Sequence, residues 1–299
     1  MVCEQPRTPT VRFAPSPHGH LHIGHAYSAL LNHNYARESG GRFLLRIEDI
    51  DQTRCRSDFL AQMFDDLHWL GLTWEEPVRR QSRHFDTYRS ALARLAKRVP
   101  LYPSTLSRQE IRDHVCAHER EHGTRWPRDP DGAPLYPALE RPAPGAPPFD
   151  VAEAKDHAVR IAMDQAVERL DGPLTWNETG CGPDGETGLL TADPLAWGDV
   201  VLARKDICTS YMLSVVVDDA IQGITHVIRG QDLFHATGVQ RLLQHFLDLP
   251  VPVYHHHGLL LDASGQKLSK SRGSASIKSL RDAGRTQDEV YDMIGVRPL

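Results

Sequence analysis

Apolar positions in the N-terminal part of the chain alternate between the spacing of a strand and the spacing of a helix. Thr10–Phe13 alternates towards a short strand, and Arg42–Ile47 is dense enough in apolar residues for a buried strand. Gly24–Ser39 and Ser57–Leu70 repeat apolar residues at helical spacing, and a glycine follows each repeat. The order strand, helix, strand, helix predicts a parallel α/β sheet.

The pattern changes in the middle of the chain and then becomes regular again. Prolines recur throughout residues 126–149, a density that no central strand or helix tolerates, so a loop-rich insertion is expected there. Regular patterning returns over Ala152–Leu170. Leu213–Val217 and Ile224–Ile228 are predicted to be strands, and Thr237–Leu247 is predicted to be a helix.

The composition is that of an ordinary globular protein, with 40% apolar and 24% charged residues. No run of about 18 apolar residues occurs, and the first ten residues lack the apolar stretch of a signal peptide. A cytoplasmic location without a membrane contact is therefore expected. The net charge of −5 still permits a nucleic-acid partner, because binding depends on local basic patches. One candidate patch consists of Arg79, Arg80 and Arg83, with a solvated loop as the alternative interpretation.

The cysteines give no sign of a disulfide framework or of a cysteine zinc knuckle. They are odd in number, widely scattered and never arranged as CxxC or CxC, and are predicted to be reduced thiols. Their positions are Cys3, Cys55, Cys116, Cys181 and Cys208.

The first motif with chemical content is HIGH, which follows the first predicted strand and a proline-containing turn. It would bring His22 and His25 together at the N-terminus of a helix, where free backbone N–H groups and the helix dipole favour phosphate. Gly24 removes a side chain where a nucleotide would lie against the backbone. Both imidazoles could donate hydrogen bonds to a triphosphate.

The second motif, KLSKS, carries Lys267 and Lys270 between Gly265 and Gly273. A loop with two ammonium groups can close over a triphosphate and neutralise the departing pyrophosphate. The two motifs together therefore predict a site that activates a substrate with ATP.

Six segments give the chain a resemblance to the glutamyl branch of class I aminoacyl-tRNA synthetases. They are RFAPSP (12–17), LHIGHA (21–26), RIEDID (46–51), SYMLSVVVDD (210–219), GITHVIRGQDL (223–233) and KLSKS (267–271). The resemblance implies a Rossmann-like catalytic domain with a parallel sheet, split by an α/β insertion domain of the acceptor-binding type. Residues 1–100 and 196–260 would form the two halves of the catalytic domain, 101–195 the insertion, and 261–299 the KLSKS loop with one or two helices.

The short length adds a second implication, because too few residues follow KLSKS for an anticodon-binding domain with its own core. In this respect the chain is similar to the truncated glutamyl-queuosine tRNA(Asp) synthetase family. That family uses ATP with Mg²⁺ to activate L-glutamate and attaches it to the queuosine base of tRNA(Asp). A monomer is expected. The open alternatives are a glutamyl-tRNA synthetase without its anticodon domain, a small-molecule nucleotidyltransferase with an HxGH motif, and an idle tRNA-binding module.

The resemblance also implies roles for individual residues. Arg12 would pair with the γ-carboxylate of glutamate, and Glu48 would bind its α-ammonium group. The rest of the amino-acid pocket would consist of Ala14, Ser16, Tyr211 and Arg229. ATP would contact His22, Gly24, His25 and Lys270, with His22, His25, Lys267 and Lys270 as the catalytic residues. Asp49 and Asp51 are expected to be structural.

The chain departs from this family at a zinc site that many members carry in the insertion. Ser104, Leu106 and Glu140 stand where the family has cysteines, so no zinc is expected. His114, His118 and His122 share one face of a predicted helix and are expected to form a solvated face, with metal binding as the less favoured alternative.

Overall fold

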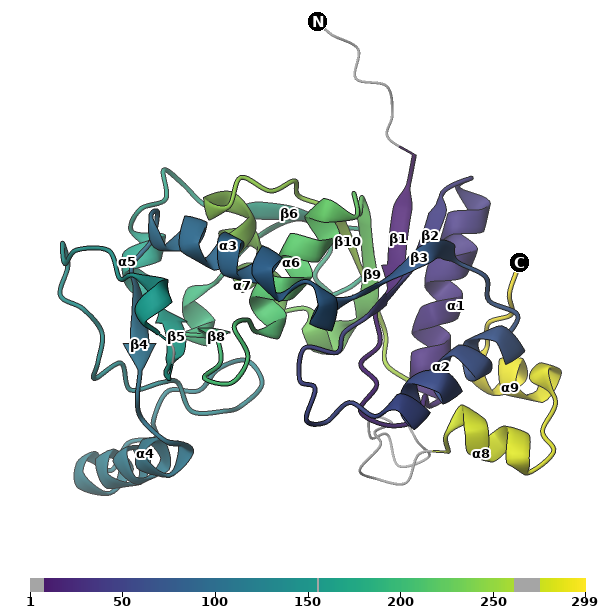
Figure 1. Ribbon diagram of the computed structural model, residues 1–299, viewed down its shortest axis with the longest axis horizontal. Helices are drawn as coiled ribbons and strands as arrows, with labels where there is room; N and C mark the ends of the chain where they lie inside the picture. The colour runs from purple at the N-terminus through teal and green to yellow at the C-terminus, as the bar shows by residue number, and fades with distance from the viewer. Residues whose placement is uncertain (1–7, 155, 261–274) are drawn as a thin grey trace, which may run out of the picture.

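The computed structural model describes residues 8–154, 156–260 and 275–299, which form three sheets with helices packed around them (Figure 1). The first sheet has the order β1–β2–β3, with β1 at Thr10–Phe13, β2 at Arg42–Ile47 and β3 at Glu75–Arg80, all parallel. Helices α1 (Ile23–Glu38) and α2 (Ser57–Trp69) connect its strands. The predicted strand–helix–strand–helix order is confirmed, and both predicted strands have the expected bounds.

The second sheet has the order β7–β6–β10–β9. Strands β6 (Thr175–Glu178), β9 (His226–Gly230) and β10 (Val253–His257) run parallel. Strand β7 (Gly188–Thr191) pairs antiparallel with β6. The strand predicted at Ile224–Ile228 is therefore present as β9, displaced towards the C-terminus.

The two sheets meet where β1 lies beside β9. The backbone N–H of Thr225 donates to the carbonyl of Thr10 at 2.9 Å, and the N–H of Thr10 donates to Oγ1 of Thr225 at 2.8 Å. Asn32 of α1 also donates to the carbonyl of Ile228 in β9 at 3.1 Å. The carboxyl ends of the parallel strands therefore open on one side, where ligands bind in α/β proteins of this kind.

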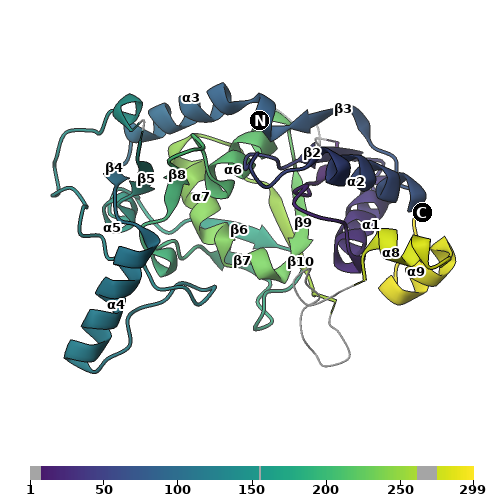
Figure 2. The ribbon, with the colours of Figure 1, turned by 60° about the horizontal axis from the view of Figure 1, so that its bottom comes forward.

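The third sheet is antiparallel, with the order β4 (Leu101–Ser104), β5 (Ala158–Ile161) and β8 (Val201–Ala203). Helix α5 (Met163–Val167) lies beside it, and α4 (Arg108–His122) projects away from the rest of the molecule in both views (Figures 1 and 2). The division expected after residue 195 does not follow the hydrogen bonds of the sheets. Strands β6 and β7 precede it but pair with the second sheet, whereas β8 follows it but pairs with β5.

Leu213–Val217 is not a strand, and that prediction is wrong. The run lies within helix α6 (Tyr211–Ile221), which shares a hydrophobic core with α3 (Phe85–Ala96) and α7 (Ala236–Phe246). Because α6 is buried on most of its surface, its apolar residues up to Val217 follow one another with only Ser214 between them, and such a run has the same pattern as a buried strand. The helix predicted at Thr237–Leu247 is confirmed as α7.

The C-terminal residues 275–299 form α8 (Ile277–Asp282) and α9 (Gln287–Ile294), as expected for the tail, and these helices pack beside α1 and α2 (Figure 2). The backbone N–H of Ile277 donates to the carbonyl of Leu21 at 2.8 Å. Single turns of 3-10 helix occur at Gln81–Arg83, Val151–Glu153, Leu195–Trp197 and Gln231–Leu233. None of the helices in the described part of the chain has the length and apolar character needed to cross a membrane.

Candidate active site

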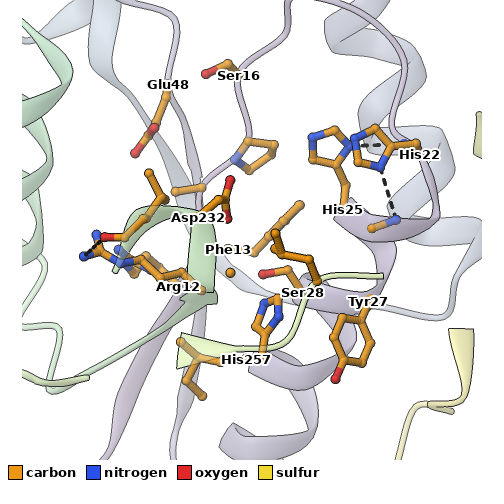
Figure 3. A pocket seen from close by; sticks show the side chains of 18 of the residues that line it. Arg12, Phe13, Ser16, His22, His25, Tyr27, Ser28, Glu48, Asp232 and His257 are labelled. Carbon is orange, nitrogen blue, oxygen red and sulfur yellow. Dashed lines mark hydrogen bonds between the residues drawn. The ribbon is translucent and has the colours of Figure 1, made fainter. Parts of the chain in front are cut away.

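A cavity of about 470 Å³ opens at the carboxyl ends of β1, β2, β9 and β10 (Figure 3). Most of the residues predicted from the sequence line it, namely Arg12, Ala14, Ser16, His22, Gly24, His25, Glu48, Tyr211 and Arg229. Figure 3 shows Arg12 and Glu48 on one side of this space and His22 and His25 on the other. Lys267 and Lys270 lie outside the described residues, so their position relative to the cavity stays a prediction.

The two histidines of HIGH form the N-terminal cap of α1. Nδ1 of His22 accepts a hydrogen bond from the backbone N–H of Gly24, and Nδ1 of His25 accepts one from the N–H of His22, both at 3.1 Å. Their ring centroids are 3.7 Å apart. Because each Nδ1 is an acceptor, the hydrogen of each ring is on Nε2, which makes Nε2 a hydrogen-bond donor. Two donors beside a helix N-terminus suit a phosphate.

Gly24 has a structural reason in addition to the predicted nucleotide contact. A Cβ at this position would lie 3.0 Å from Cε1 and 3.1 Å from Nδ1 of His22. A Cβ at this position would therefore require the His22 ring to shift by a few tenths of an ångström. The absence of a side chain at position 24 lets the His22 ring pack closely over the first turn of α1.

Arg12 is held from behind by a buried carboxylate. Its Nε and Nη2 donate to the two oxygens of Asp219 at 2.9 and 3.3 Å, and Arg46 donates to the same carboxylate at 2.7 Å. Burial alone would raise the pKa of Asp219, but Arg12 and Arg46 hold that pKa below its usual value. Asp219 is therefore an anion shared by two arginines.

Glu48 lies on the cavity side of the same cluster. Its carboxylate accepts a hydrogen bond from Arg46 at 3.2 Å, and its side chain is 11% exposed. Burial raises the pKa of Glu48, although Arg46 and Arg12 oppose the increase. An ammonium group arriving in the cavity would stabilise the ionised form, which fits the expected contact with the α-ammonium of an amino acid.

Arg229, on β9, is held by uncharged groups. It donates to Nε2 of His256 at 3.0 Å, to Oγ1 of Thr237 at 2.8 Å and to the carbonyl of Leu233 at 3.1 Å. Its Nη1 lies 3.5 Å from the hydroxyl of Tyr211. No carboxylate among the described residues forms an ion pair with it. The charge of Arg229 is thus available to an anionic ligand, whereas the charge of Arg12 is already shared with Asp219.

The described residues on both sides of 261–274 lie at this cavity. Leu259 and Leu260 line it, and Ser276 pairs with His22 in an isolated antiparallel bridge. The described residues before and after positions 261–274 therefore lie at the cavity or next to one of the residues that line it.

Sequence reasoning missed the residues that hold the site from outside. Arg46 and Asp219 lie within segments that carried the resemblance, but nothing in the sequence indicates that they form an ion pair across 173 positions. Asp49 is structural, as predicted, because it accepts hydrogen bonds from Arg80 and Ser82. Arg79 likewise pairs with buried Asp218 at 2.7 Å, so two arginines of the candidate basic patch are occupied by carboxylates.

Asp51 is also structural. One of its oxygens accepts from Thr53 at 2.7 Å and the other from Arg204 at 2.9 Å. These bonds tie the loop after β2 to the segment after β8, outside the residues that line the cavity.

Ser104 and Glu140, at two of the positions where the family has zinc ligands, are linked by hydrogen bonds through Tyr136. The hydroxyl of Tyr136 lies 2.9 Å from Oγ of Ser104 and donates to Glu140, which also accepts from the backbone N–H of Thr105 at 2.9 Å. Leu106 packs beside Tyr136 in a small hydrophobic cluster. The set Ser, Leu and Glu provides no thiolate for zinc.

The three histidines of α4 contact aromatic rings. His114 and His118 meet the ring of Trp126 edge-on, with centroid distances of 5.3 and 4.7 Å, and His118 stacks on His122 at 4.1 Å. In residues 8–154, 156–260 and 275–299, no three or more His, Cys, Asp or Glu residues are grouped to hold a metal ion.

The fold and the cavity agree with the comparison to known families. Residues 9–297 match the family model described as tRNA synthetases class I (E and Q), catalytic domain. The chain therefore belongs to the class I tRNA synthetases of the glutamate and glutamine group.

Individual relatives indicate which proteins within this family the chain resembles. The chain is 45% identical to the glutamyl-Q tRNA(Asp) synthetase of Rhodobacter capsulatus, over 95% of this chain and 99% of that protein. It is 38% identical to the glutamyl-Q tRNA(Asp) synthetase of Symbiobacterium thermophilum, over 93% of this chain and 83% of that protein. The glutamate–tRNA synthetase structure from Elizabethkingia anophelis matches 89% of this chain with a TM-score of 0.71 and 27% identity, and the chain spans 53% of its length.

Proposed function

We propose that this protein activates L-glutamate with ATP and transfers the glutamyl group to the queuosine base in the anticodon of tRNA(Asp). The observation that carries the proposal is the similarity over 99% of the length of the Rhodobacter capsulatus glutamyl-Q tRNA(Asp) synthetase. The cavity supports it, because it combines HIGH histidines with a pocket of arginines and one carboxylate.

In the first step, the α-carboxylate of glutamate attacks the α-phosphorus of ATP, forming glutamyl-adenylate and releasing pyrophosphate. No protein base is required, since the carboxylate is ionised at neutral pH. Glu48 would bind the α-ammonium group, and Arg229 and Arg12 would face the γ-carboxylate. Nε2–H of His22 and of His25 would donate to the phosphates, and Lys267 and Lys270 would neutralise the pyrophosphate.

Arg229 is the stronger candidate for choosing glutamate over glutamine. A carboxylate can compensate its charge, whereas a neutral amide leaves a buried guanidinium without a counter-charge. Arg12 would contribute mainly an oriented hydrogen-bond donor, because its charge is already balanced by Asp219.

Mg²⁺ would accompany ATP as a ligand of the triphosphate. Mg²⁺ is usually held by substrate phosphates, water and one or two carboxylates, which fits a cavity whose described lining includes Asp232 but no cluster of metal ligands. Zinc is not part of the proposal.

In the second step, a hydroxyl of the cyclopentene diol of queuosine attacks the acyl group of glutamyl-adenylate, and AMP leaves. The mixed anhydride is already activated, so positioning of the tRNA is the main demand on the protein. Such an activity fits a cytoplasmic location, where ATP and tRNA are available.

The first step is tested by ATP–pyrophosphate exchange. We expect exchange with L-glutamate and at least 100-fold less with L-glutamine, and we expect R229Q to lose most of this preference. Equal exchange with both amino acids in the unsubstituted protein would contradict the assignment of the pocket. A glutamyl-tRNA synthetase would pass this test too, so the acceptor has to be tested separately.

A further inference from the structure

Two buried side chains behind Arg229 contribute nothing to the cavity lining. Nδ1 of His256, on β10, lies 2.6 Å from Oε2 of Glu178, at the end of β6, and both side chains are 0% exposed. On the other edge of the ring, Nε2 of His256 lies 3.0 Å from Nε of Arg229. The three groups form a continuous line that ends at the cavity.

The chemistry of arginine fixes the direction of every hydrogen bond in this line. Nε of an arginine carries a hydrogen at all relevant pH values, so Nε2 of His256 must be the acceptor. The hydrogen of the neutral imidazole is therefore on Nδ1 and is donated to Glu178. Burial lowers the pKa of His256 to about 4 even though Glu178 opposes the shift, which keeps the ring uncharged at neutral pH.

Glu178 is itself fixed by the backbone around it. Its Oε1 accepts from the N–H of His256 at 2.8 Å and from the N–H of Gly180 at 2.9 Å. These bonds and the His256 side chain hold the pKa of Glu178 at about 2, against the effect of burial. Gly180 permits the close approach, because a Cβ there would lie 2.3 Å from the carbonyl oxygen of His256.

We propose that Glu178 and His256 are positioning residues for glutamate activation, acting through the guanidinium of Arg229. The carboxylate selects the tautomer of His256, and the imidazole then fixes the orientation of Arg229 without neutralising it. A carboxylate placed directly on Arg229 would also orient it, but it would cancel the charge that the substrate needs. The proposal rests on the proposed function, because the ligand of Arg229 is taken to be the carboxylate of glutamate.

The substitution E178Q changes the hydrogen-bonding partner of His256, and thereby its tautomer, while keeping the size and shape of the side chain at position 178. If the amide oxygen keeps the two backbone N–H bonds, the amide N–H₂ faces Nδ1 and forces the ring hydrogen onto Nε2, where it opposes the N–H of Arg229. We expect the KM for glutamate to rise at least 10-fold, because a buried donor loses its acceptor, while the KM for ATP stays within 2-fold. The matched control is Y254F, which keeps the ring beside His256 and removes only the bond from Gln244 to the Tyr254 hydroxyl.

Two substitutions of His256 provide an internal rescue. H256L removes the acceptor and should raise the KM for glutamate at least as much as E178Q. H256Q can present an amide oxygen to Arg229 and should recover part of the loss. A merely structural role would lower the melting temperature and the amount of active enzyme, and leave the KM for glutamate unchanged. Folded E178Q and H256L with a KM for glutamate within 2-fold of the unsubstituted protein would overturn the proposal.

A measurement on the unsubstituted protein covers the case in which the variants fail to fold. In ¹⁵N-histidine NMR, the signals of His256 are assigned by their contacts to neighbouring residues, or by their absence from the spectrum of H256Q. We expect these signals to show a neutral imidazole with hydrogen on Nδ1 and none on Nε2. Hydrogen on Nε2 would overturn the proposal whatever the activity. Absence of glutamate-dependent exchange in the unsubstituted protein would instead refute the proposed function, so the two failures are distinguishable.

Discussion

The substitution D219N removes the negative charge between Arg12 and Arg46 without changing the size of the side chain. Asp219 accepts three hydrogen bonds from these arginines, at 2.7, 2.9 and 3.3 Å, and is 6% exposed. The asparagine keeps one acceptor oxygen, but its N–H₂ group then faces a guanidinium. Two buried cations are left with less compensation, and Arg12 loses the bidentate contact that orients it.

The expected cost follows from the burial of the ion pair. Removing one partner of a buried pair destabilises a protein by about 3–5 kcal/mol, and the oxygen that remains favours the lower end of that range. A loss of about 3 kcal/mol corresponds to a fall of about 5 °C in the melting temperature of a 299-residue chain, because the unfolding entropy is about 2.1 cal/mol/K per residue. The KM for glutamate should rise about 10-fold because Arg12 lines the cavity.

The neighbouring substitution D218N is the matched control. Asp218 is also buried and accepts from Arg79, Gln81 and Tyr88 at 2.7–2.9 Å. It lies 4.0 Å from Nε of Arg46 without a hydrogen bond, and none of these four partners lines the cavity. Thermal unfolding should therefore show a similar loss of stability in both variants, and exchange kinetics should show a higher KM for glutamate only in D219N. A D219N protein within about 1 kcal/mol of the original, or an equal rise in KM in both variants, would refute this reasoning.

Three further predictions concern the His22 cap of α1, Lys270 of KLSKS and the buried pair of His256 and Glu178. H22A should lower the exchange rate at least 100-fold by removing a phosphate donor, whereas T286A, at the N-cap of α9, should cost about 1 kcal/mol of stability and leave exchange unchanged. K270A should abolish exchange without changing the melting temperature; exchange at the original rate would contradict its role. The pKa of His256 is about 4 in the folded protein because of burial, compared with 6.5 for a solvent-exposed imidazole, so the unfolded chain binds this proton more tightly. Stability should thus be complete above pH 6.5 and fall by about 3 kcal/mol as the pH drops to 4, and urea unfolding of H256Q should lack this fall.

Local patterns were sufficient for the elements that begin the fold. Thr10–Phe13 and Arg42–Ile47 have the predicted bounds because each strand is short, apolar and followed by a turn or polar segment. The arrangement of the HIGH segment could be predicted equally well, because its two histidines form hydrogen bonds to backbone groups within one helical turn. The strand predicted at Leu213–Val217 failed because an apolar run does not distinguish a buried helix from a buried strand.

Partners that are far apart in sequence could not be predicted. Arg12 meets Asp219 across 207 positions, and Glu178 meets His256 across 78, so no periodicity connects them. The sequence also could not predict which sheet β6 and β8 join, because these strands pair with strands that are distant along the chain. The sequence therefore predicts which side chains line the cavity better than it predicts which side chains hold them.

The acceptor is the central claim, and it is tested most directly by transfer of labelled glutamate to purified tRNA. The protein is incubated with labelled L-glutamate, ATP and Mg²⁺ together with tRNA(Glu), or with tRNA(Asp) that does or does not contain queuosine. We predict label on queuosine-containing tRNA(Asp) alone, retained when the 3′ terminal adenosine has been removed. Label on tRNA(Glu) alone, or on tRNA(Asp) without queuosine, would contradict the account.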